Sequence, residues 1–214
     1  MTERIPVVEK ILSANDKLAQ ENQAQLDAAK VFAINIMASP GAGKTSLIEA
    51  TLPRLAEKLR VAVVDGDVAT SIDADRASAA GAAVAVQVNT GGECHLDAVM
   101  LHQALGQVDL AAVDMVLVEN VGNLICPAEF PLGTDKRVVV ISVTEGPYMI
   151  LKHPFTFINA DVMVINKKDL AQTMKIDIKQ LQNQAKEVKP TIKVAVTNAL
   201  TGEGVEELMK ALEL

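Results

Sequence analysis

Beyond residue 30, short apolar runs rich in Val and Ile alternate with longer segments in which apolar residues recur at helical spacing. Hydrophobicity within each run is continuous rather than alternating, which predicts strands buried on both faces. Such strands are typical of an α/β three-layer sandwich, in which helices flank a mostly parallel central sheet. We predict strands at residues 31–37, 61–65, 82–88, 114–120, 137–143, 161–167 and 192–197, with intervening helices that include 46–59 and 95–105.

The first 30 residues follow a different pattern. Apolar residues recur with a period of about 3.6 residues and are separated by Glu, Lys and Gln, which predicts an amphipathic helix. Its apolar stripe consists of Ile5, Val8, Ile11, Leu12 and Leu18. We expect this N-terminal helical extension, residues 1–30, to pack against the body of the protein or a second subunit. Residues 31–214 are expected to form one domain.

Composition and charge exclude several classes of protein. The 214 residues carry 20 basic and 27 acidic side chains and only 2% aromatic residues, which argues against a nucleic-acid partner. No apolar stretch approaches the roughly 18 residues of a membrane span, and the N-terminus lacks a secretion signal. We therefore expect a cytoplasmic protein without a membrane partner. Its two cysteines would stay reduced there, which favours metal binding or reactivity over a disulfide.

Residues 38–45 read Ala-Ser-Pro-Gly-Ala-Gly-Lys-Thr and lie between a predicted strand and a predicted helix. This is the P-loop pattern G-x-x-x-x-G-K-[ST], with Ala38 in place of the first glycine. Small residues let backbone N–H groups close around phosphate oxygens, Lys44 supplies positive charge, and Thr45 supplies a hydroxyl ligand for Mg²⁺. The pattern predicts a P-loop NTPase whose phosphate-binding residues are Gly41, Ala42, Gly43, Lys44, Thr45 and Ser46.

The sixth predicted strand ends in the N-K-x-D quartet of residues 166–169. The Asp169 carboxylate can accept hydrogen bonds from guanine N1–H and from the exocyclic amine, whereas adenine offers no such pair of donors. Asn166 can brace the neighbouring loops, and the stem of Lys167 can lie along the base. The turn Thr197-Asn198-Ala199 follows the last strand, where its backbone N–H groups could reach the guanine O6. GTP and GDP are therefore the predicted nucleotides.

Two acidic strand ends fall between these motifs. They are Asp65-Gly66-Asp67 after the second strand and Glu119 in the fourth, and a carboxylate at these positions can hold Mg²⁺ directly or through water. Glu119 begins an E-x-x-G sequence in which the Gly122 N–H is expected to sense a γ-phosphate. No glutamine follows to position the attacking water, so hydrolysis is expected to be slow. Asp67 and Asp75 are candidates for the general base. The predicted catalytic residues are Lys44, Thr45, Asp67, Glu119 and Gly122.

The cysteines define a second candidate site. Cys94-His95 and Cys126 both lie in segments that leave the expected ligand-binding edge of the sheet. Two thiolates and an imidazole suit Ni²⁺ or Zn²⁺ rather than a hard cation. Three ligands are one short of a closed tetrahedral site, so water or a second subunit would complete it. His102 and His153 read as structural or surface residues.

Several longer segments resemble the HypB family, the nickel-inserting GTPases of hydrogenase maturation, which are P-loop GTPases of the SIMIBI class. The segments are GDVATSIDADR, NTGGECHLDAVM, ENVGNLICPAEFPLG, TEGPYMILKHPFTF and NADVMVINKKDL. The resemblance implies GTP and Mg²⁺ binding and a homodimer promoted by nucleotide. It also implies delivery of Ni²⁺ to the large subunit of [NiFe] hydrogenase together with the accessory protein HypA. The family's metal site corresponds to Cys94, His95 and Cys126.

Residues 1–30 contain no Cys or His, so the separate N-terminal nickel motif of some family members is not expected here. One alternative is a metal-binding module in which nucleotide sets the oligomeric state and turnover is incidental. Another is the related urease-type nickel GTPase, although ENVGNLICP resembles the hydrogenase branch more. A third, an ATP-dependent P-loop enzyme, conflicts with the quartet at residues 166–169.

Overall fold

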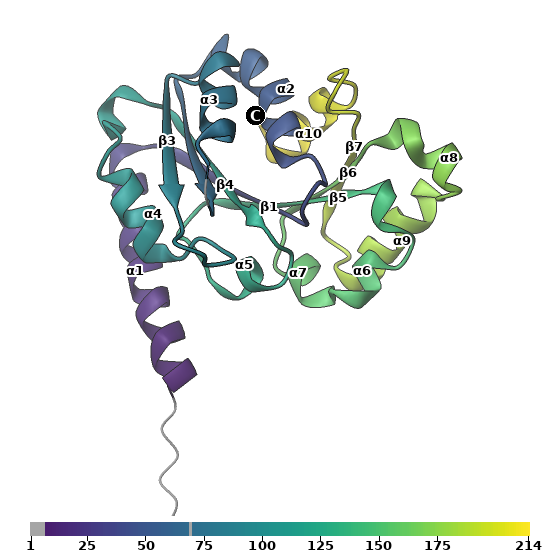
Figure 1. Ribbon diagram of the computed structural model, residues 1–214, viewed down its shortest axis with the longest axis horizontal. Helices are drawn as coiled ribbons and strands as arrows, with labels where there is room; N and C mark the ends of the chain where they lie inside the picture. The colour runs from purple at the N-terminus through teal and green to yellow at the C-terminus, as the bar shows by residue number, and fades with distance from the viewer. Residues whose placement is uncertain (1–6, 69) are drawn as a thin grey trace, which may run out of the picture.

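The computed structural model describes residues 7–68 and 70–214, in which seven parallel strands form one sheet in the order β3-β2-β4-β1-β5-β6-β7 (Figure 1). The strands are β1 (Phe32–Ala38), β2 (Val61–Asp67), β3 (Val84–Asn89), β4 (Met115–Gly122), β5 (Lys136–Ser142), β6 (Val162–Asn166) and β7 (Lys193–Val196). Each strand begins and ends within two residues of its predicted run. The predicted α/β fold class is therefore confirmed.

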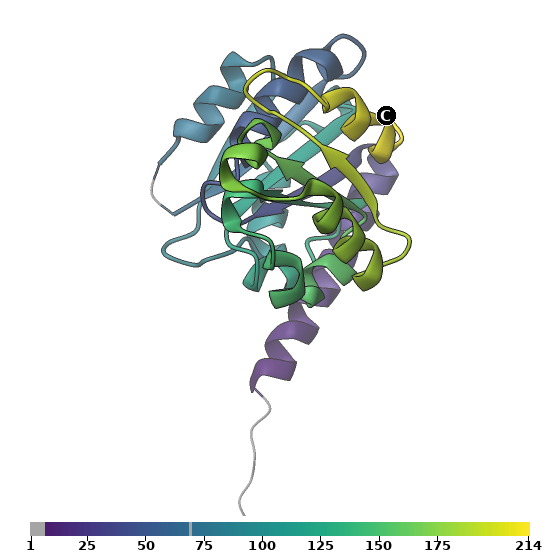
Figure 2. The same ribbon diagram turned by 90° about the vertical axis from the view of Figure 1, so that its right-hand side faces the viewer.

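Helices cover both faces of the sheet (Figures 1 and 2). The helices are α1 (Val7–Ala29), α2 (Lys44–Ala56), α3 (Ile72–Ala79), α4 (Ala98–Leu105), α5 (Cys126–Glu129), α6 (Met149–Lys152), α7 (Pro154–Ile158), α8 (Ala171–Met174), α9 (Ile178–Val188) and α10 (Val205–Leu212). Short 3₁₀ turns are η1 (Leu110–Ala112), η2 (Val143–Glu145) and η3 (Lys168–Leu170). Within the described ranges, no helix has the length and hydropathy that crossing a membrane requires.

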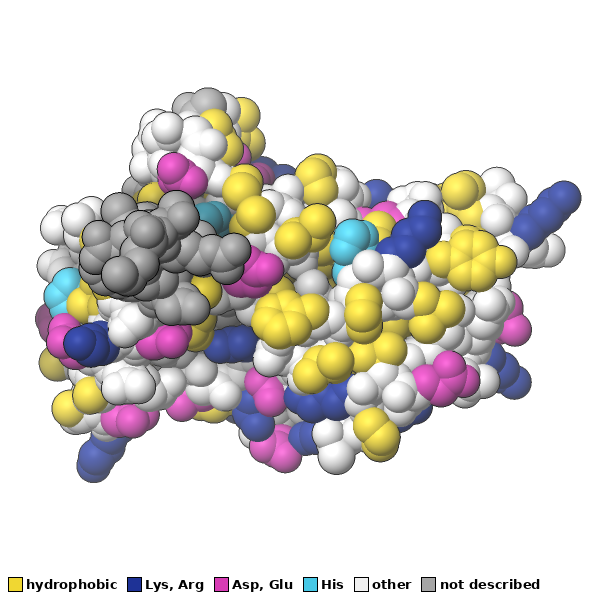
Figure 3. Space-filling view, turned by 90° about the horizontal axis from the view of Figure 1, so that it is seen from below, with side chains coloured by type: hydrophobic (Ala, Val, Ile, Leu, Met, Phe, Trp, Pro, Cys, Tyr) yellow, Lys and Arg dark blue, Asp and Glu magenta, His cyan; other side chains and the backbone are white. Residues whose placement is uncertain are grey.

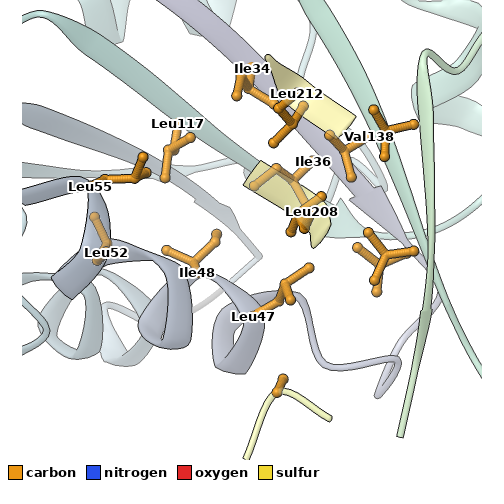
Figure 4. Close-up of a cluster of buried hydrophobic side chains, with 14 of the residues drawn as sticks. Ile34, Ile36, Leu47, Ile48, Leu52, Leu55, Leu117, Val138, Leu208 and Leu212 are labelled. Atoms are coloured by element: carbon orange, nitrogen blue, oxygen red, sulfur yellow. The ribbon is translucent and has the colours of Figure 1, made fainter. Parts of the chain in front are cut away.

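Alternate residues of each strand face opposite helical layers, which is why the apolar runs are continuous. On β1, Ile34 and Ile36 join the buried cluster made with α2 and α10, which Figure 4 shows. Ala33 contacts the layer of α1 and α4 on the other face, and Met37 contacts the layer of α7 and α9. Buried side chains therefore form a core layer on each face of the central sheet.

Helix α1 runs beside α4, and its N-terminal part extends beyond the rest of the protein (Figure 1). Its buried residues are Asn15, Ala19, Asn22 and Leu26, whereas Leu12 and Leu18 are half-buried. The predicted stripe thus flanks the face that is buried. Ile5 and the side chains of Val8 and Ile11 lie outside the described part of the chain.

Two buried asparagines attach α1 to the body of the protein. Asn15 Nδ2 donates to the carbonyl of Pro131 at 2.9 Å, and its Oδ1 accepts from the N–H of Ala98 at 2.8 Å. Asn22 Nδ2 donates to the carbonyls of Ala98 and Leu132 at 2.9 and 3.0 Å. These bonds satisfy backbone groups at the start of α4 and in the loop before β5, which buried backbone requires. Hydrophobic periodicity could not predict a contact made by amides.

Candidate functional site

A cleft of about 630 Å³ opens where β1, β2, β4 and β6 end, the edge at which parallel sheets bind ligands. It brings together residues of the P-loop, the acidic strand ends and the N-K-x-D quartet. The predicted site residues that line it are Gly41, Gly43, Lys44, Thr45, Ser46, Asp67, Glu119, Gly122, Asn166, Lys167, Asp169, Asn198 and Ala199. Ala42 and Thr197 are buried beside it and do not line it.

The conformation of the P-loop explains its glycines. Gly41 and Gly43 have φ of 74° and 97°, in the left-handed region that side chains other than glycine adopt at a cost. A Cβ on Gly43 would also lie 2.5 Å from Asn166 Nδ2. Helix α2 begins directly after Gly43 with Lys44 and Thr45, so its N-terminal N–H groups border the cleft, as anion binding requires.

Asn166 links the P-loop to the loop after β7. Its Nδ2 donates to the carbonyl of Ala42 at 2.9 Å, and its Oδ1 accepts from Thr197 Oγ1 at 3.0 Å. Lys167, whose backbone is in the left-handed region, also contacts the P-loop, since its Nζ donates to the carbonyl of Gly41 at 2.7 Å. The bracing expected of Asn166 is thus present in the geometry. Asp169 is exposed at the cleft.

The turn at residues 197–199 directly follows β7. The N–H of Thr197 donates to Ile165, the N–H of Asn198 donates to Glu203, and the N–H of Ala199 donates to Asn166 Oδ1 at 3.0 Å. All three donors are therefore engaged within the protein, by carbonyls of β6 and of Glu203 and by the Asn166 side chain. A contact of these N–H groups with the guanine O6 stays a prediction.

A cluster of acids lies at the base of the cleft. Thr45 Oγ1 donates to Glu119 Oε1 at 2.7 Å, and Asp65 of β2 lies in register with Glu119 of β4. One carboxylate oxygen each from Asp65, Asp73 and Glu119 lies within 4.8 Å of the others. Hydroxyl and carboxylate oxygens are the donors that Mg²⁺ prefers, so this donor set fits that cation.

Two acids of this cluster, Asp65 and Glu119, are costly to ionise. Burial, together with the charge of the adjacent Glu119, raises the pKa of Asp65 to about 7. Burial also raises the pKa of Glu119 to about 7, although the Thr45 hydroxyl and the Lys44 charge act in the opposite direction. Asp65 Oδ2 is buried and has no hydrogen-bond partner among the described residues. A bound cation would compensate these charges.

The observed cluster differs from the set Thr45, Asp67 and Glu119 that the sequence suggested. Asp67 lines the cleft but does not belong to the cluster, while Asp65 and Asp73 do. Asp65 belongs to the acidic strand end that the sequence offered, and its register with Glu119 on the neighbouring strand, which the sequence alone does not give, places it rather than Asp67 in the cluster. Asp75, the other candidate base, is exposed and does not line the cleft.

A further carboxyl group, from η2, contacts the P-loop. Ser39 Oγ donates to Glu145 Oε1, and burial raises the pKa of Glu145 to about 7. Glu145 also completes a capping box with Ser142. No sequence motif predicted this residue, because the contact joins two loops that are 106 positions apart.

The structure brings Cys94, His95 and Cys126 together at the end of the chain segments expected to hold metal. One ligand atom of each lies within 4.8 Å of the others, and the two Sγ atoms are 3.2 Å apart. His95 Nδ1 lies 3.9 Å from Cys94 Sγ, and its ring lies 4.1 Å from that of Phe130. Burial lowers the pKa of His95, which favours the neutral imidazole that a metal binds.

The short segment at the end of β4 connects the P-loop with Cys126. Gly122, at the end of β4, packs so closely on the P-loop that a Cβ there would lie 3.2 Å from Pro40 Cα. Four residues later, Cys126 begins α5. Contact with Cys94 raises the pKa of the Cys126 thiol, so a cation is needed to hold both sulfurs as thiolates.

The fold and the cleft define a P-loop nucleotide-binding protein, and a cluster of two cysteines and a histidine lies nearby. Residues 13–196 match the family model described as "CobW/HypB/UreG, nucleotide-binding domain". The chain is 44% identical over 209 residues to a probable hydrogenase maturation factor HypB of Methanocaldococcus jannaschii, an alignment that covers 98% of this chain and 94% of the relative. The chain belongs to the HypB family of these nucleotide-binding proteins.

Two solved structures are similar over nearly their whole length. The hydrogenase maturation factor HypB of Archaeoglobus fulgidus superposes with a TM-score of 0.86 at 40% identity, covering 94% of this chain and 98% of that one. HypB of Helicobacter pylori, solved in complex with nickel, also gives 0.86, at 32% identity and 94% coverage of each chain. The expected family and architecture are thereby confirmed.

Proposed function

We propose that the protein is a GTP-hydrolysing metallochaperone that binds Ni²⁺, and also Zn²⁺, and assists nickel insertion into the large subunit of [NiFe] hydrogenase. The observation that carries the proposal is the convergence of Cys94, His95 and Cys126 at the end of a segment that packs on the P-loop. The names of the similar proteins, and the nickel complex of one of them, support the same role.

GTP is the proposed nucleotide because Asp169 stands at the cleft with an exposed carboxylate. Lys44 would neutralise the β- and γ-phosphates, and Gly122 would sense the γ-phosphate. Mg²⁺ would be held by Thr45 and Glu119, with Asp67 and the buried Asp65 acting directly or through water. The cation would supply charge compensation for the phosphates and for these acids.

Dimerisation is proposed because a three-ligand site is incomplete and lies beside an exposed apolar surface. Ile125, Leu151, Phe155 and Ile158 are about half exposed. Figure 3 shows hydrophobic side chains gathered on this face, over α5, α6 and α7. Helix α7 is tied to the segment before Cys126, since Thr156 Oγ1 donates to the carbonyl of Leu124 at 2.6 Å. Large exposed apolar patches mark association surfaces.

In the proposed cycle, GTP and metal favour a homodimer in which the triad of Cys94, His95 and Cys126 from each of the two copies shares metal. Hydrolysis changes the segment that ends at Cys126 and loosens the metal for transfer. The acceptors would be a HypA-type nickel accessory protein and the hydrogenase large subunit, in the cytoplasm.

Native mass spectrometry tests this proposal directly. The protein is measured with GDP and with a non-hydrolysable GTP analogue, each with and without Ni²⁺ or Zn²⁺. We expect a dimer enriched by the analogue and enriched further by metal, with loss of the metal effect in Cys94→Ala. A dimer fraction that changes with neither nucleotide nor metal would refute nucleotide-gated assembly.

A metal-binding module with incidental turnover is the second candidate, favoured by the lack of a glutamine after Gly122. Steady-state GTPase rates with and without the acceptor protein separate the two. Acceleration by the acceptor supports a GTPase that gates metal transfer. An unchanged rate, together with nucleotide-dependent dimerisation, supports the module.

A further inference from the structure

Asn123 lies between the two sites and contacts both. It directly follows Gly122, and its backbone forms an antiparallel bridge with Ala38, the residue that opens the P-loop. The preceding residue, Gly122, packs on Pro40 of the same loop. The backbone of Asn123 is therefore held by the part of the protein that surrounds the phosphates.

The side chain of Asn123 contacts the segments that carry the two thiols. Its Nδ2 donates to the carbonyl of Cys94 at 3.2 Å. Its Oδ1 accepts from the N–H of Ile125, the residue before Cys126, at 2.9 Å. One amide thus bridges segments 29 positions apart in the sequence, and Cys94 Sγ and Cys126 Sγ lie 3.2 Å from each other across that bridge.

We propose that Asn123 is the positioning residue that couples the nucleotide at the P-loop to the geometry of the Cys94–His95–Cys126 metal site. This inference rests on the proposed nucleotide-gated metal transfer and names the residue that transmits it. A shift of residues 121–123 against the P-loop would move the amide that sets the distance between the cysteine segments. The affinity for metal would then depend on the nucleotide.

A second asparagine in the same region does not fit this role. Asn120 is fully buried, and its Nδ2 donates to Asn35 Oδ1 of β1 at 3.2 Å. Its Oδ1 accepts from the N–H of Leu96 at 2.9 Å. Asn120 therefore fixes one end of the Cys94–His95 segment to the sheet. Asn123, half-buried and beyond the end of regular β4 pairing, holds the side that faces Cys126.

The two substitutions to compare are Asn123→Ala and Asn123→Asp. Asn123→Ala removes both side-chain bonds. Asn123→Asp keeps the shape and the acceptor for Ile125 but faces the carbonyl of Cys94 with an acceptor, so that bridge is lost. Asn89→Ala is the matched control, because Asn89 Oδ1 accepts from the N–H of Gly91 in the loop before Cys94. The Asn89 side chain has no hydrogen bond to residues 121–126 in the described chain.

The measurement is the Kd for Ni²⁺ with GDP and with a non-hydrolysable GTP analogue, by competition with a chromogenic chelator. The ultraviolet thiolate-to-nickel absorption band is recorded in both states. For wild type we expect the two Kd values to differ by roughly 5–150-fold, the usual range of allosteric coupling. In both Asn123 variants the ratio should fall to about 1–2 and the band should no longer change with nucleotide. Asn89→Ala should keep the wild-type ratio.

The outcomes separate this inference from the proposed function. If wild type shows coupling and Asn123→Ala keeps it, the assignment of Asn123 is overturned while nucleotide-gated metal binding stands. If wild type shows equal Kd values, the gating itself is overturned and the role of Asn123 falls with it. If the variants lose nickel in both nucleotide states, Asn123 belongs to the metal site rather than to the coupling.

Discussion

At the scale of single residues, the carboxyl group of Asp65 is held at an energetic cost. It is buried, one of its oxygens lacks a hydrogen-bond partner within the described chain, and Glu119 stands beside it on the neighbouring strand. An uncompensated buried carboxylate is strongly unfavourable, so such a group normally takes up a proton or a cation. Its position beside Glu119, which accepts the Thr45 hydroxyl, fits the binding of a cation at the cleft.

The raised pKa of Asp65 predicts how the stability of the nucleotide-free protein depends on pH. Its pKa rises from 3.8 to about 7 on folding, so in that interval the folded state binds more protons than the unfolded state. The free energy of unfolding contributed by this group is therefore present below pH 3.8 and is lost as pH rises toward 7. Glu119 contributes with the same sign.

We expect Asp65→Asn to flatten the decline in the free energy of unfolding between pH 4 and 7, measured by urea denaturation without Mg²⁺ or nucleotide. The exposed Asp75→Asn is the control and should leave the slope unchanged. An identical slope in wild type and Asp65→Asn would show that Asp65 keeps a normal pKa.

The exposed carboxylate of Asp169 predicts nucleotide selectivity. In Asp169→Asn one acceptor oxygen becomes a donor that faces the donors of guanine, so GTP affinity should fall by about 1–3 kcal/mol. Xanthosine triphosphate, which offers a carbonyl at that edge, should bind the variant better than it binds wild type. Isothermal titration with both nucleotides checks this. Unchanged affinity for GTP would remove Asp169 from the base site.

At the scale of elements, α1 is attached by amides as well as by apolar packing. Asn22 is fully buried, donates to two backbone carbonyls and lies with its Oδ1 2.8 Å from His102 Nδ1 of α4. Leu26, one turn later, is fully buried in the cluster shared with α4. His102, predicted from the sequence to be a structural or surface residue, therefore contacts Asn22 of α1. Hydrogen bonds with specific geometry thus position the helix.

This arrangement predicts an asymmetric response to substitution along α1. Asn22→Ala leaves two buried carbonyls without their donor, which should cost about 1–3 kcal/mol of unfolding free energy. Gln25→Ala, at an exposed position of the same helix, should change it by less than about 0.5 kcal/mol. Urea denaturation measures both. Equal stabilities of the two variants would mean that Asn22 does not hold α1 on the body.

At the scale of the whole molecule, one edge of the sheet gathers both sites. The P-loop follows β1, Asp65 and Glu119 lie near the ends of β2 and β4, and the quartet begins at the last residue of β6, while the cysteine segments follow β3 and β4. Because β4 lies next to both β1 and β2, its continuation contacts the P-loop on one side and the cysteines on the other. The strand order therefore provides a short connection for the proposed coupling between the P-loop and the cluster of Cys94, His95 and Cys126.

The composition of the triad predicts a specific loss of metal binding. His95→Ala removes the imidazole and should weaken Ni²⁺ or Zn²⁺ binding at least about 10–100-fold, the range found even for groups that only support a ligand. His153→Ala is the matched control, since His153 precedes α7 and lies outside the triad. Equilibrium dialysis gives both Kd values. Wild-type affinity in His95→Ala would exclude that residue as a ligand.

The seven strands, the P-loop pattern and the quartet at the end of β6 could all be predicted from the amino-acid sequence. Continuous Val and Ile runs are typical of strands covered by helices on both faces. A loop that closes its backbone around phosphates tolerates few residue types at 41–45. The sequence also indicated that Cys94, His95 and Cys126 belong to one site. These features depend on local backbone sterics, on burial, and on chemistry that each segment carries alone.

Which side chains meet across segments depends on how the chain packs in three dimensions. The register of β2 with β4 joined Asp65 to Glu119, and the packing of α1 turned Asn22 into an anchor. The N–H groups of the turn after β7 donate to carbonyls of β6 and of Glu203 and to Asn166 Oδ1. The end of β4 places Asn123 between two loops. Hydrogen-bond partners far apart in the chain are chosen by register and loop packing, which no periodicity in the sequence encodes.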